Sequence, residues 1–226
     1  CLNLLNLYQQ QYLKLDKSYS ASIELGHRSR AIYILNTANR TYKDVQRNFS
    51  KVRKRELKYA RKKYYKCNLN IVEARYLLEH EEYKTLHYGF YKSFPSPELP
   101  IGLLITLLNN KLLELTAYYS DADNALLGVT LSKNIYGEYY IPFLIYQRSN
   151  RRLKGISTFM FNSEIERGMN QAATYINLGT SISNSNASKF KSTLGAHAYR
   201  TYDDKRTEGI GSCKAIVITD SWIYKI

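Results

Sequence analysis

Short apolar runs, separated by a basic turn and one helical segment, dominate residues 139–200. The runs 139–147 (YYIPFLIYQ) and 173–181 (ATYINLGTS) have the composition of buried strands. Between them lie the turn RRLKGIS (151–157) and the segment 158–171, which is typical of a crossover helix. A right-handed crossover places the helix N-terminus and the carboxyl ends of both strands at one edge of the sheet, where open α/β sheets usually bind ligands. The pattern therefore predicts a ligand site at that edge.

Upstream of this unit, the apolar positions first follow a strand-like run and then a helical period. Residues 31–35 (AIYIL) are predicted to form a short buried strand. In residues 41–66, apolar side chains recur every three or four positions, which predicts one amphipathic helix with a single apolar stripe. Thr41 followed by Asp44 is typical of a capping box. We therefore expect this helix to begin directly after Thr41.

The next segments indicate a further strand and two helices. Residues 68–74 are predicted to form a strand, and residues 76–94 a helix that ends at the first proline after it. The segment 95–100 (PSPELP) is expected to be a rigid loop, because proline stops the elements on both sides. Residues 100–110 (PIGLLITLLNN) are again helical in pattern. Glu98 is a carboxylate in this constrained, apolar-flanked loop, which makes it a candidate general base.

From residue 111 onward, the chain changes to β-rich runs separated by turn signals. The runs are 111–120, 126–134 and 139–147, with turns at Asp121–Asn124 and Tyr136–Glu138. This alternation predicts an antiparallel meander that leads into the apolar run at 139. Pro142 inside the third run requires a bulge or a sheet edge, because proline has no N–H to donate to a ladder.

The positive net charge of the chain indicates an anionic binding partner. Thirty-three Lys and Arg residues against 19 Asp and Glu give a formal net charge of +14, which implies nucleic acid, a phosphate-bearing cofactor or a membrane surface as partner. Residues 41–66 are the most basic segment. Like charges four positions apart on a helix cost about 0.2–0.5 kcal/mol per pair. Two interpretations stay open: a solvated basic face, or a surface that an anionic ligand stabilises.

Cysteine usage and hydropathy narrow the class of protein. Cys1, Cys67 and Cys213 are too few and too scattered for a disulfide framework or a zinc site, so no metal is predicted and a reduced, intracellular chain is expected. No apolar run reaches the roughly 18 residues of a membrane helix, and the N-terminus lacks the basic region of a signal peptide. These features favour a soluble, cytoplasmic protein.

The turn before the predicted crossover helix is the best candidate for an anion site. Gly155 lets the backbone approach a diphosphate, and Arg151, Arg152 and Lys154 supply positive charge. The N-terminus of the following helix adds the positive end of its dipole, which contributes about 0.3–1 kcal/mol to anion binding. The alternative interpretation is a basic turn that an ordinary glycine caps.

Several short motifs in residues 125–205 follow the order of a known superfamily. They are Arg152-x-x-Gly155-x-Ser157, Tyr175-Ile-Asn-Leu-Gly-Thr180 and Phe190-Lys191-x-x-Leu194-Gly195. With these motifs the region resembles the GNAT acyltransferases, specifically the branch of the peptidoglycan bridge-forming Fem transferases and the BioF2-like acetyltransferase domains. The basic segment 47–63 (RNFSKVRKRELKYARKK) also resembles a Fem-type helix.

The resemblance implies an α+β (α/β) fold, with a GNAT-like mixed sheet that is mainly antiparallel, one parallel βαβ crossover and helices on both faces. It places the acyltransferase core in residues 111–226. Residues 1–110 would form a helical and strand region with the basic helix, and a partial first GNAT-like half is one interpretation of that region. The chain departs from the superfamily pattern at Ile156 and Ser157, where further glycines are usual.

The activity that the resemblance implies is transfer of an acyl group from acetyl-CoA or another acyl-CoA to an amine, by direct attack. The parted strands 140–146 and 174–178 would form the slot for the acyl-thioester arm. The implied binding site for the CoA diphosphate consists of Arg151, Arg152, Lys154, Gly155, Ile156 and Ser157.

The candidates for catalysis and substrate binding lie near the ends of these elements. Tyr199 and Tyr202, after the turn at Gly195, are candidates to protonate the leaving thiolate, which is a contribution of about 10²–10⁴-fold for acid–base help of this kind. Glu98 is the candidate base. The candidates for substrate binding are Asn177, Thr180 and Lys191. His197 is the histidine closest to the Gly195 turn, and a satisfied or solvent-exposed histidine without a catalytic role is its simpler interpretation.

Two other functions stay open. A Fem-like aminoacyl transferase would take its acyl group from aminoacyl-tRNA and act on a cell-envelope precursor or an amino sugar. The tRNA contacts would then come from Lys51, Arg53, Lys54, Arg55, Lys58, Arg61 and Lys62. A non-catalytic nucleic-acid-binding module would use the same charge, with a basic groove and aromatic stacking platforms.

Overall fold

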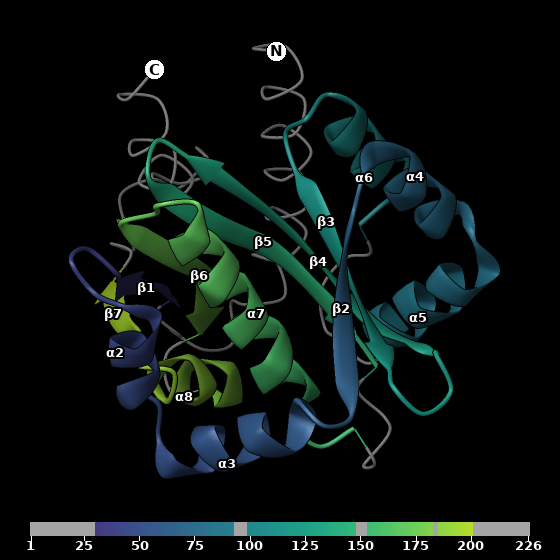
Figure 1. Cartoon of the computed structure of the whole chain (residues 1–226). Coiled ribbons are helices and arrows are strands. Elements are labelled where there is room, and N and C mark those ends of the chain that lie inside the picture. Colours follow the sequence, from purple (N-terminus) through teal and green to yellow (C-terminus); the bar gives the residue numbers. More distant parts are fainter. Residues whose placement is uncertain (1–29, 93–98, 148–152, 183–184, 201–226) are drawn as a thin grey trace, which may run out of the picture.

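Seven strands form one mixed sheet in the computed structural model, which describes residues 30–92, 99–147, 153–182 and 185–200 (Figure 1). The strand order is β2-β3-β4-β5-β6-β1-β7, and within the described residues β5 and β6 are the one parallel pair. The strands are β1 (Arg30–Asn36), β2 (Tyr64–Leu69), β3 (Glu114–Ser120), β4 (Leu126–Ile135), β5 (Glu138–Tyr146), β6 (Tyr175–Ile182) and β7 (His197–Arg200).

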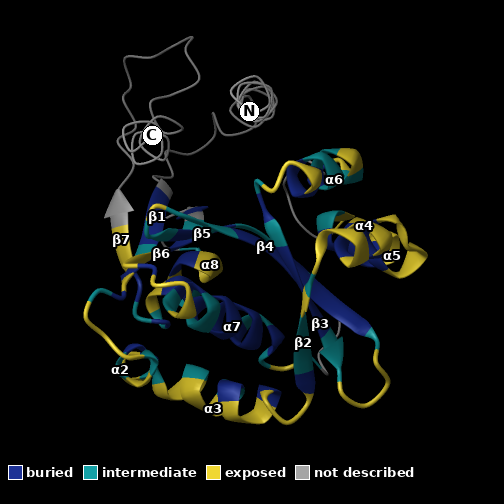
Figure 2. Ribbon diagram, turned by 45° about the horizontal axis from the view of Figure 1, so that its top comes forward, coloured by how far each residue is buried: buried dark blue, intermediate teal, exposed yellow. Residues whose placement is uncertain are grey.

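Helices cover both faces of this sheet (Figures 1 and 2). The group α4, α5 and α6 packs on one face, and the group α2, α3, α7 and α8 packs on the other. This arrangement confirms the expected α+β fold with a mainly antiparallel sheet and one parallel crossover. The helices are α2 (Tyr42–Arg47), α3 (Lys51–Ala60), α4 (Ile71–Glu79), α5 (Glu81–Lys92), α6 (Ile101–Asn109), α7 (Ile156–Asn170) and α8 (Asn186–Ser192).

The alternation of side chains along the central strands produces two hydrophobic cores. In β3, Leu115 and Ala117 belong to the core under α4–α6, whereas Tyr118 belongs to the core under α7. Successive residues of a strand point to opposite faces of the sheet, so a strand with helices on both sides is apolar at nearly every position. The run β3–β5 therefore stabilises both helical layers at once.

The basic segment 41–66 is not the single helix that its apolar stripe predicted. Thr41 does cap α2, and the capping box with Asp44 is confirmed. The helix ends at Arg47, however, and Ser50 begins α3 by accepting a hydrogen bond from the backbone N–H of Arg53 at 3.3 Å. Two short helices with separate caps therefore meet at an angle, and β2 starts at Tyr64.

The predicted strand 68–74 and helix 76–94 also have different boundaries. β2 ends at Leu69, and Asn70 caps α4 in a capping box with Glu73, so the helix starts inside the predicted strand. His80 then separates α4 from α5 with an extended backbone. The wrong end of the strand and the missed break in the helix have the same cause. In both places a polar residue between two apolar segments ends one element and begins the next, although the apolar pattern continues.

The predicted meander and the last helix before it are confirmed. Pro100 is the N-cap of α6, and β3, β4 and β5 pair in antiparallel order. Pro142 lies in a bulge, where Ile141 and Pro142 of β5 face the single residue Ser132 of β4. The missing N–H of Pro142 therefore interrupts no regular ladder position.

The sheet takes strands from both sides of residue 110. β1 and β2 come from the first part of the chain and the other five strands from the second. The division of the chain into 1–110 and 111–226 stays a prediction. In the described part of the chain, no helix is long and apolar enough to cross a membrane.

Candidate active site

The strands β5 and β6 are paired over only a short distance. Their parallel ladder consists of Glu138 with Tyr175, Tyr139 with Ile176 and Tyr140 with Asn177. β5 then continues to Tyr146 and β6 to Ile182, without further pairing between them. An opening between parted parallel strands is where the sequence predicts the acyl-thioester arm, so its surroundings define the candidate active site.

Both strands carry a bulge directly after the ladder ends. On β5 the bulge contains Pro142, which has no N–H to donate to a neighbour. On β6, Leu178 and Gly179 face the single residue Tyr33 of β1. Gly179 has a φ of 76°, a backbone conformation that glycine adopts without steric cost, and its N–H donates to Oδ1 of Asn177 at 2.9 Å. Pro142 on β5 and Gly179 on β6 therefore favour the separation of the two strands after the ladder.

Lys191 of α8 extends toward this opening from the face of the sheet on which α7 and α8 pack. Its Nζ donates to the carbonyl oxygen of Gly179 at 3.1 Å and lies 5.6 Å from the ring centre of Tyr33. A Cβ at position 179 would lie 3.6 Å from the carbonyl oxygen of Ile141 and 3.8 Å from Nζ of Lys191. The amine is thus next to the point where β5 and β6 separate.

The environment of Lys191 changes its proton affinity. The residue is 7% exposed, and burial lowers its pKa from 10.5 to about 7. A lysine of this kind is charged for part of the time near neutral pH. Of the residues predicted to bind substrate, Lys191 therefore has the environment most typical of a functional site.

Asn177 is buried at the last pair of the ladder. Its Nδ2 donates to Oε1 of Glu138 at 2.9 Å, and its Oδ1 accepts the N–H of Gly179. The Nδ2 end of the amide therefore joins β6 to β5, and the Oδ1 end holds the bulge within β6. This position is consistent with a structural role beside the site, and substrate binding by Asn177 stays a prediction.

The backbones of Thr180 and Tyr199 lie on either side of the same residue of β1. Thr180 of β6 and Tyr199 of β7 both pair with Ile32. The structure therefore brings two of the predicted site residues into one region of the sheet, in the three adjacent strands β6, β1 and β7. The predicted residues Glu98, Arg151, Arg152 and Tyr202 lie outside the described residues.

The N-terminus of α7 differs from the open phosphate site that the sequence indicated. Gly155 is the N-cap with a φ of 84°, as the predicted turn requires. A Cβ at position 155 would lie 3.0 Å from the carbonyl oxygen of Glu56, so α3 packs directly against the turn. Ile156 is 3% exposed and its N–H donates to Leu153, whereas Ser157 is half-buried and Lys154 is exposed.

A carboxylate from α3 already lies at the first turn of α7. Oε2 of Glu56 accepts a hydrogen bond from Oγ1 of Thr158 at 2.7 Å and also forms an ion pair with Arg53. A negative charge is favourable at a helix N-terminus, and Glu56 supplies one there. Binding of a diphosphate at this turn stays a prediction. The sequence did not indicate this role for Glu56, since its partner on α7, Thr158, is 102 positions away.

Arg53 therefore is not one of the outward-facing basic residues. Its Nε donates to Oγ1 of Thr193 at 3.0 Å, and its guanidinium lies 4.3 Å from the ring centre of Phe190. With Glu56, these contacts join α3, α7 and α8. The other predicted tRNA contacts, Lys51, Lys54, Arg55, Lys58, Arg61 and Lys62, are exposed on the surface.

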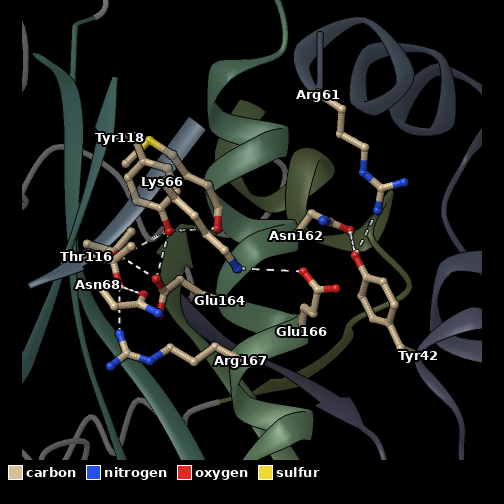
Figure 3. Close-up of polar contacts among 12 residues, drawn as sticks. Tyr42, Arg61, Lys66, Asn68, Thr116, Tyr118, Asn162, Glu164, Glu166 and Arg167 are labelled. Carbon is tan, nitrogen blue, oxygen red and sulfur yellow. Dashed lines mark hydrogen bonds and ion pairs between the residues drawn. The ribbon is translucent and has the colours of Figure 1, made fainter. Parts of the chain in front are cut away.

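A fully buried carboxylate lies between α7 and the sheet (Figure 3). Glu164 is fully buried and accepts four hydrogen bonds of 2.5–2.8 Å, from the hydroxyl groups of Tyr118, Thr130, Ser132 and Tyr139. Burial, and then the charge of Glu164, raise the pKa of both tyrosines. The cluster fixes α7 on strands β3, β4 and β5. Its four partners lie 25–46 positions away on three strands, so no local pattern indicated this role.

Polar contacts continue along the outer side of α7 (Figure 3). Tyr42 of α2 donates to Oδ1 of Asn162 at 2.7 Å, and Arg61 donates to the hydroxyl of Tyr42 at 3.2 Å. Lys66 and Glu166 form an ion pair at 3.6 Å. The helix at the centre of the fold is thus bound to its neighbours by polar contacts on several sides. Within the described residues, no group of His, Cys, Asp or Glu side chains is arranged to hold a metal ion.

Solved structures with the same fold exist, although sequence comparisons find no relative. No family model matches the chain, and no curated protein sequence matches it. FemX superimposes with a TM-score of 0.62 at 10% identity, over 76% of this chain and 60% of FemX. L-PGS from Bacillus licheniformis superimposes with a TM-score of 0.58 at 15% identity, over 86% of this chain and 67% of L-PGS. The match spans less than two thirds of FemX. These likenesses show that the chain has the fold of FemX and L-PGS, as the resemblance to the Fem branch implied.

Proposed function

We propose that the chain is an N-acyltransferase that works at the opening between β5 and β6. The observation that carries the proposal is Lys191, a buried amine next to the parted strands with a pKa of about 7. The fold shared with FemX and L-PGS supports the same class of reaction. The active residues and the acyl donor are parts of this proposal.

The proposed reaction is direct transfer. The nitrogen of the acceptor amine attacks the acyl carbonyl carbon, the bond from that carbon to the leaving sulfur or oxygen breaks, and the amine proton passes to the leaving group. Charged Lys191 donates a hydrogen bond to the carbonyl oxygen while negative charge develops on it. Tyr199 and Tyr202 remain the proposed proton donors to the leaving group.

Two acyl donors are compatible with this reaction. Acyl-CoA is the donor that the turn at Gly155 indicated, but Glu56 at the first turn of α7 opposes a diphosphate there. An aminoacyl ester on tRNA, as the Fem resemblance implies, needs no diphosphate at that turn. The experiment therefore uses both donors. Lys154→Glu tests the turn better than a change of Gly155, because a Cβ at Gly155 would collide with α3.

The test measures acyl transfer from radiolabelled acetyl-CoA and from radiolabelled alanyl-tRNA to a lysine-containing peptide. We expect Lys191→Met to reduce transfer at least about 100-fold, as removal of an oxyanion donor does. Lys189→Met is the matched control, because Lys189 is an exposed lysine on the same helix. We expect Lys191→Arg to keep part of the activity. The ratio of wild-type to Lys191→Arg activity should fall between about pH 6.5 and 8.5. In this range Lys191 loses its charge, whereas an arginine at the same position stays charged.

Full activity of Lys191→Met with both donors would overturn the role of Lys191. The absence of transfer from either donor by the wild-type chain would overturn the proposed function. Activity with acetyl-CoA that Lys154→Glu does not weaken would place the CoA diphosphate away from this turn.

A further inference from the structure

A hollow of about 520 Å³ lies between α2 and α3 on the outer side of the molecule. Its floor contains Phe49 and Leu57, which are 3% and 5% exposed and belong to the core. Its walls consist of polar and basic side chains from α2, α3 and the turn after α3, and Figure 2 shows that much of the ribbon of α3 is exposed. The residues that line the walls are Lys43, Gln46, Arg47, Lys54, Lys58, Arg61 and Lys62.

Six of these side chains are positively charged, and little negative charge compensates them. Asp44 forms an ion pair with Arg47 at 3.0 Å. Glu56, the acidic residue of α3, instead faces α7. Within the described residues, no acidic side chain forms an ion pair with Lys43, Lys58 or Lys62. The concave surface therefore concentrates positive potential, which an anionic ligand would neutralise.

The shape of the hollow is fixed by contacts with the rest of the fold. The break between α2 and α3 is held by the N–H of Ser50, which donates to the carbonyl oxygen of Thr193 at 2.9 Å. Nε2 of Gln46 donates to Tyr42 at 2.7 Å and to Asn162 of α7 at 2.9 Å. Arg61 is held by the same tyrosine. Two of the lining side chains are thus positioned before any ligand binds, which reduces the entropy that binding would cost.

We propose that this hollow, the α2–α3 groove, binds the phosphodiester backbone of a nucleic acid. Six cations around one concave surface suit a chain of successive phosphates, and Lys and Arg contacts of this kind supply most of the affinity for nucleic-acid backbones. A membrane surface fits less well. Membrane-binding helices insert exposed apolar side chains beside their basic residues. The apolar residues that line this groove, Phe49 and Leu57, form its buried floor, and the exposed Val52 and Tyr59 of α3 lie outside the lining. If the acyl donor of the proposed function is an aminoacyl-tRNA, the groove would hold part of that donor; the groove is tested by binding alone, so its test is separate from the test of acyl transfer.

The test uses fluorescence anisotropy with a fluorescein-labelled RNA hairpin and a DNA hairpin of the same sequence. The groove variant is Lys58→Glu/Lys62→Glu. The control variant is Lys51→Glu/Arg55→Glu, which makes the same change of net charge in the same basic segment but outside the groove. All four side chains are exposed, so both variants are expected to fold, which circular dichroism checks.

We expect the groove variant to bind at least about tenfold more weakly than the control variant at moderate salt. Between about 50 and 200 mM salt, the logarithm of the wild-type affinity should fall linearly, and the groove variant should reduce that slope by about two. The RNA and DNA arms show which backbone is preferred.

Three results would contradict the proposal that the α2–α3 groove binds nucleic acid. The first is equal weakening by both variants, which indicates attraction by net charge alone. The second is binding of anionic phosphatidylglycerol vesicles without binding of either hairpin. The third is binding of neither probe by the wild-type chain. Nucleic-acid binding without acyl transfer would support the groove and overturn the proposed function alone.

Discussion

Two buried charges in this molecule are stabilised in different ways. The carboxylate of Glu164 accepts four hydroxyl hydrogen bonds, so its charge is compensated inside the core. Nζ of Lys191 donates to the backbone carbonyl oxygen of Gly179, and burial lowers the pKa of this amine. Burial of a charged group away from water disfavours the charged form relative to the neutral form. Glu164 therefore stabilises the structure, whereas Lys191 reduces its stability whenever it is protonated.

This difference predicts a pH-dependent stability that one residue controls. The pKa of Lys191 is about 7 in the folded chain, against 10.5 ordinarily. Between these values the unfolded chain binds more protons, so the free energy of unfolding rises with pH, by at most about 1.4 kcal/mol per pH unit. We expect the wild-type chain to gain about 2 kcal/mol relative to Lys191→Met between pH 7 and pH 9. Urea unfolding at each pH measures the difference.

The exposed Lys189 provides the control for this experiment. Lys189→Met should follow the wild-type chain across the same pH range, because its amine is solvated in both states. Parallel curves for wild-type and Lys191→Met would contradict the lowered pKa, whatever the role of the residue in catalysis.

At the scale of single elements, α7 organises the fold through its close approach to β5. The helix contacts the sheet where Gly168 lies against the ring of Tyr139. A Cβ at position 168 would lie 2.7 Å from Cγ and 2.9 Å from Cβ of that tyrosine. Tyr139 also donates to Glu164 on the same helix. The small residue thus brings the tyrosine hydroxyl within reach of the buried carboxylate.

Two glycines in helices should therefore respond to alanine in opposite directions. Gly168→Ala should lower the free energy of unfolding by about 1–3 kcal/mol, since the added methyl group displaces Tyr139. Gly102→Ala in α6 should raise it by up to about 1 kcal/mol, because alanine is the better helix former and no atom lies within 4 Å of the added Cβ. Chemical denaturation of both variants gives the comparison. A stabilising Gly168→Ala would show that Tyr139 moves without cost.

The sequence predicted elements wherever their signal was local. The strand at 31–35, the cap at Thr41 and the meander after residue 111 depend on neighbouring residues, and they are confirmed. The breaks at Ser50 and His80 were missed because the apolar pattern continues through them.

The site was less predictable, because its key contacts join distant parts of the chain. Lys191 was found through a motif, but the lowered pKa depends on burial under β6 and β1, which the sequence does not display. Glu56 and Thr158 are 102 positions apart, and Tyr118 and Glu164 are 46 apart. Neither pair follows a helical or strand period, so no pattern along the chain could indicate either contact.

At the scale of the whole molecule, the two cores share the strands between them. Leu115 and Ala117 of β3 and Ile145 of β5 face α4–α6, while Tyr118 and Tyr139 in the same two strands face α7. Loss of packing on one face therefore disturbs strands that the other face requires. β1 and β2, from the first part of the chain, pair with strands from the second. The cores are expected to unfold together.

Cavity-forming changes in each core test this coupling and the predicted division at residue 110. Leu104 of α6 and Ile165 of α7 are both fully buried, in different cores. Leu104→Ala and Ile165→Ala should each cost about 2–5 kcal/mol and should each shift one common transition, because a shared sheet leaves neither half stable alone. Urea unfolding is followed by circular dichroism, and hydrogen exchange reports β3 and β6 separately. Two transitions, with Leu104→Ala shifting only one of them, would instead support two independent domains.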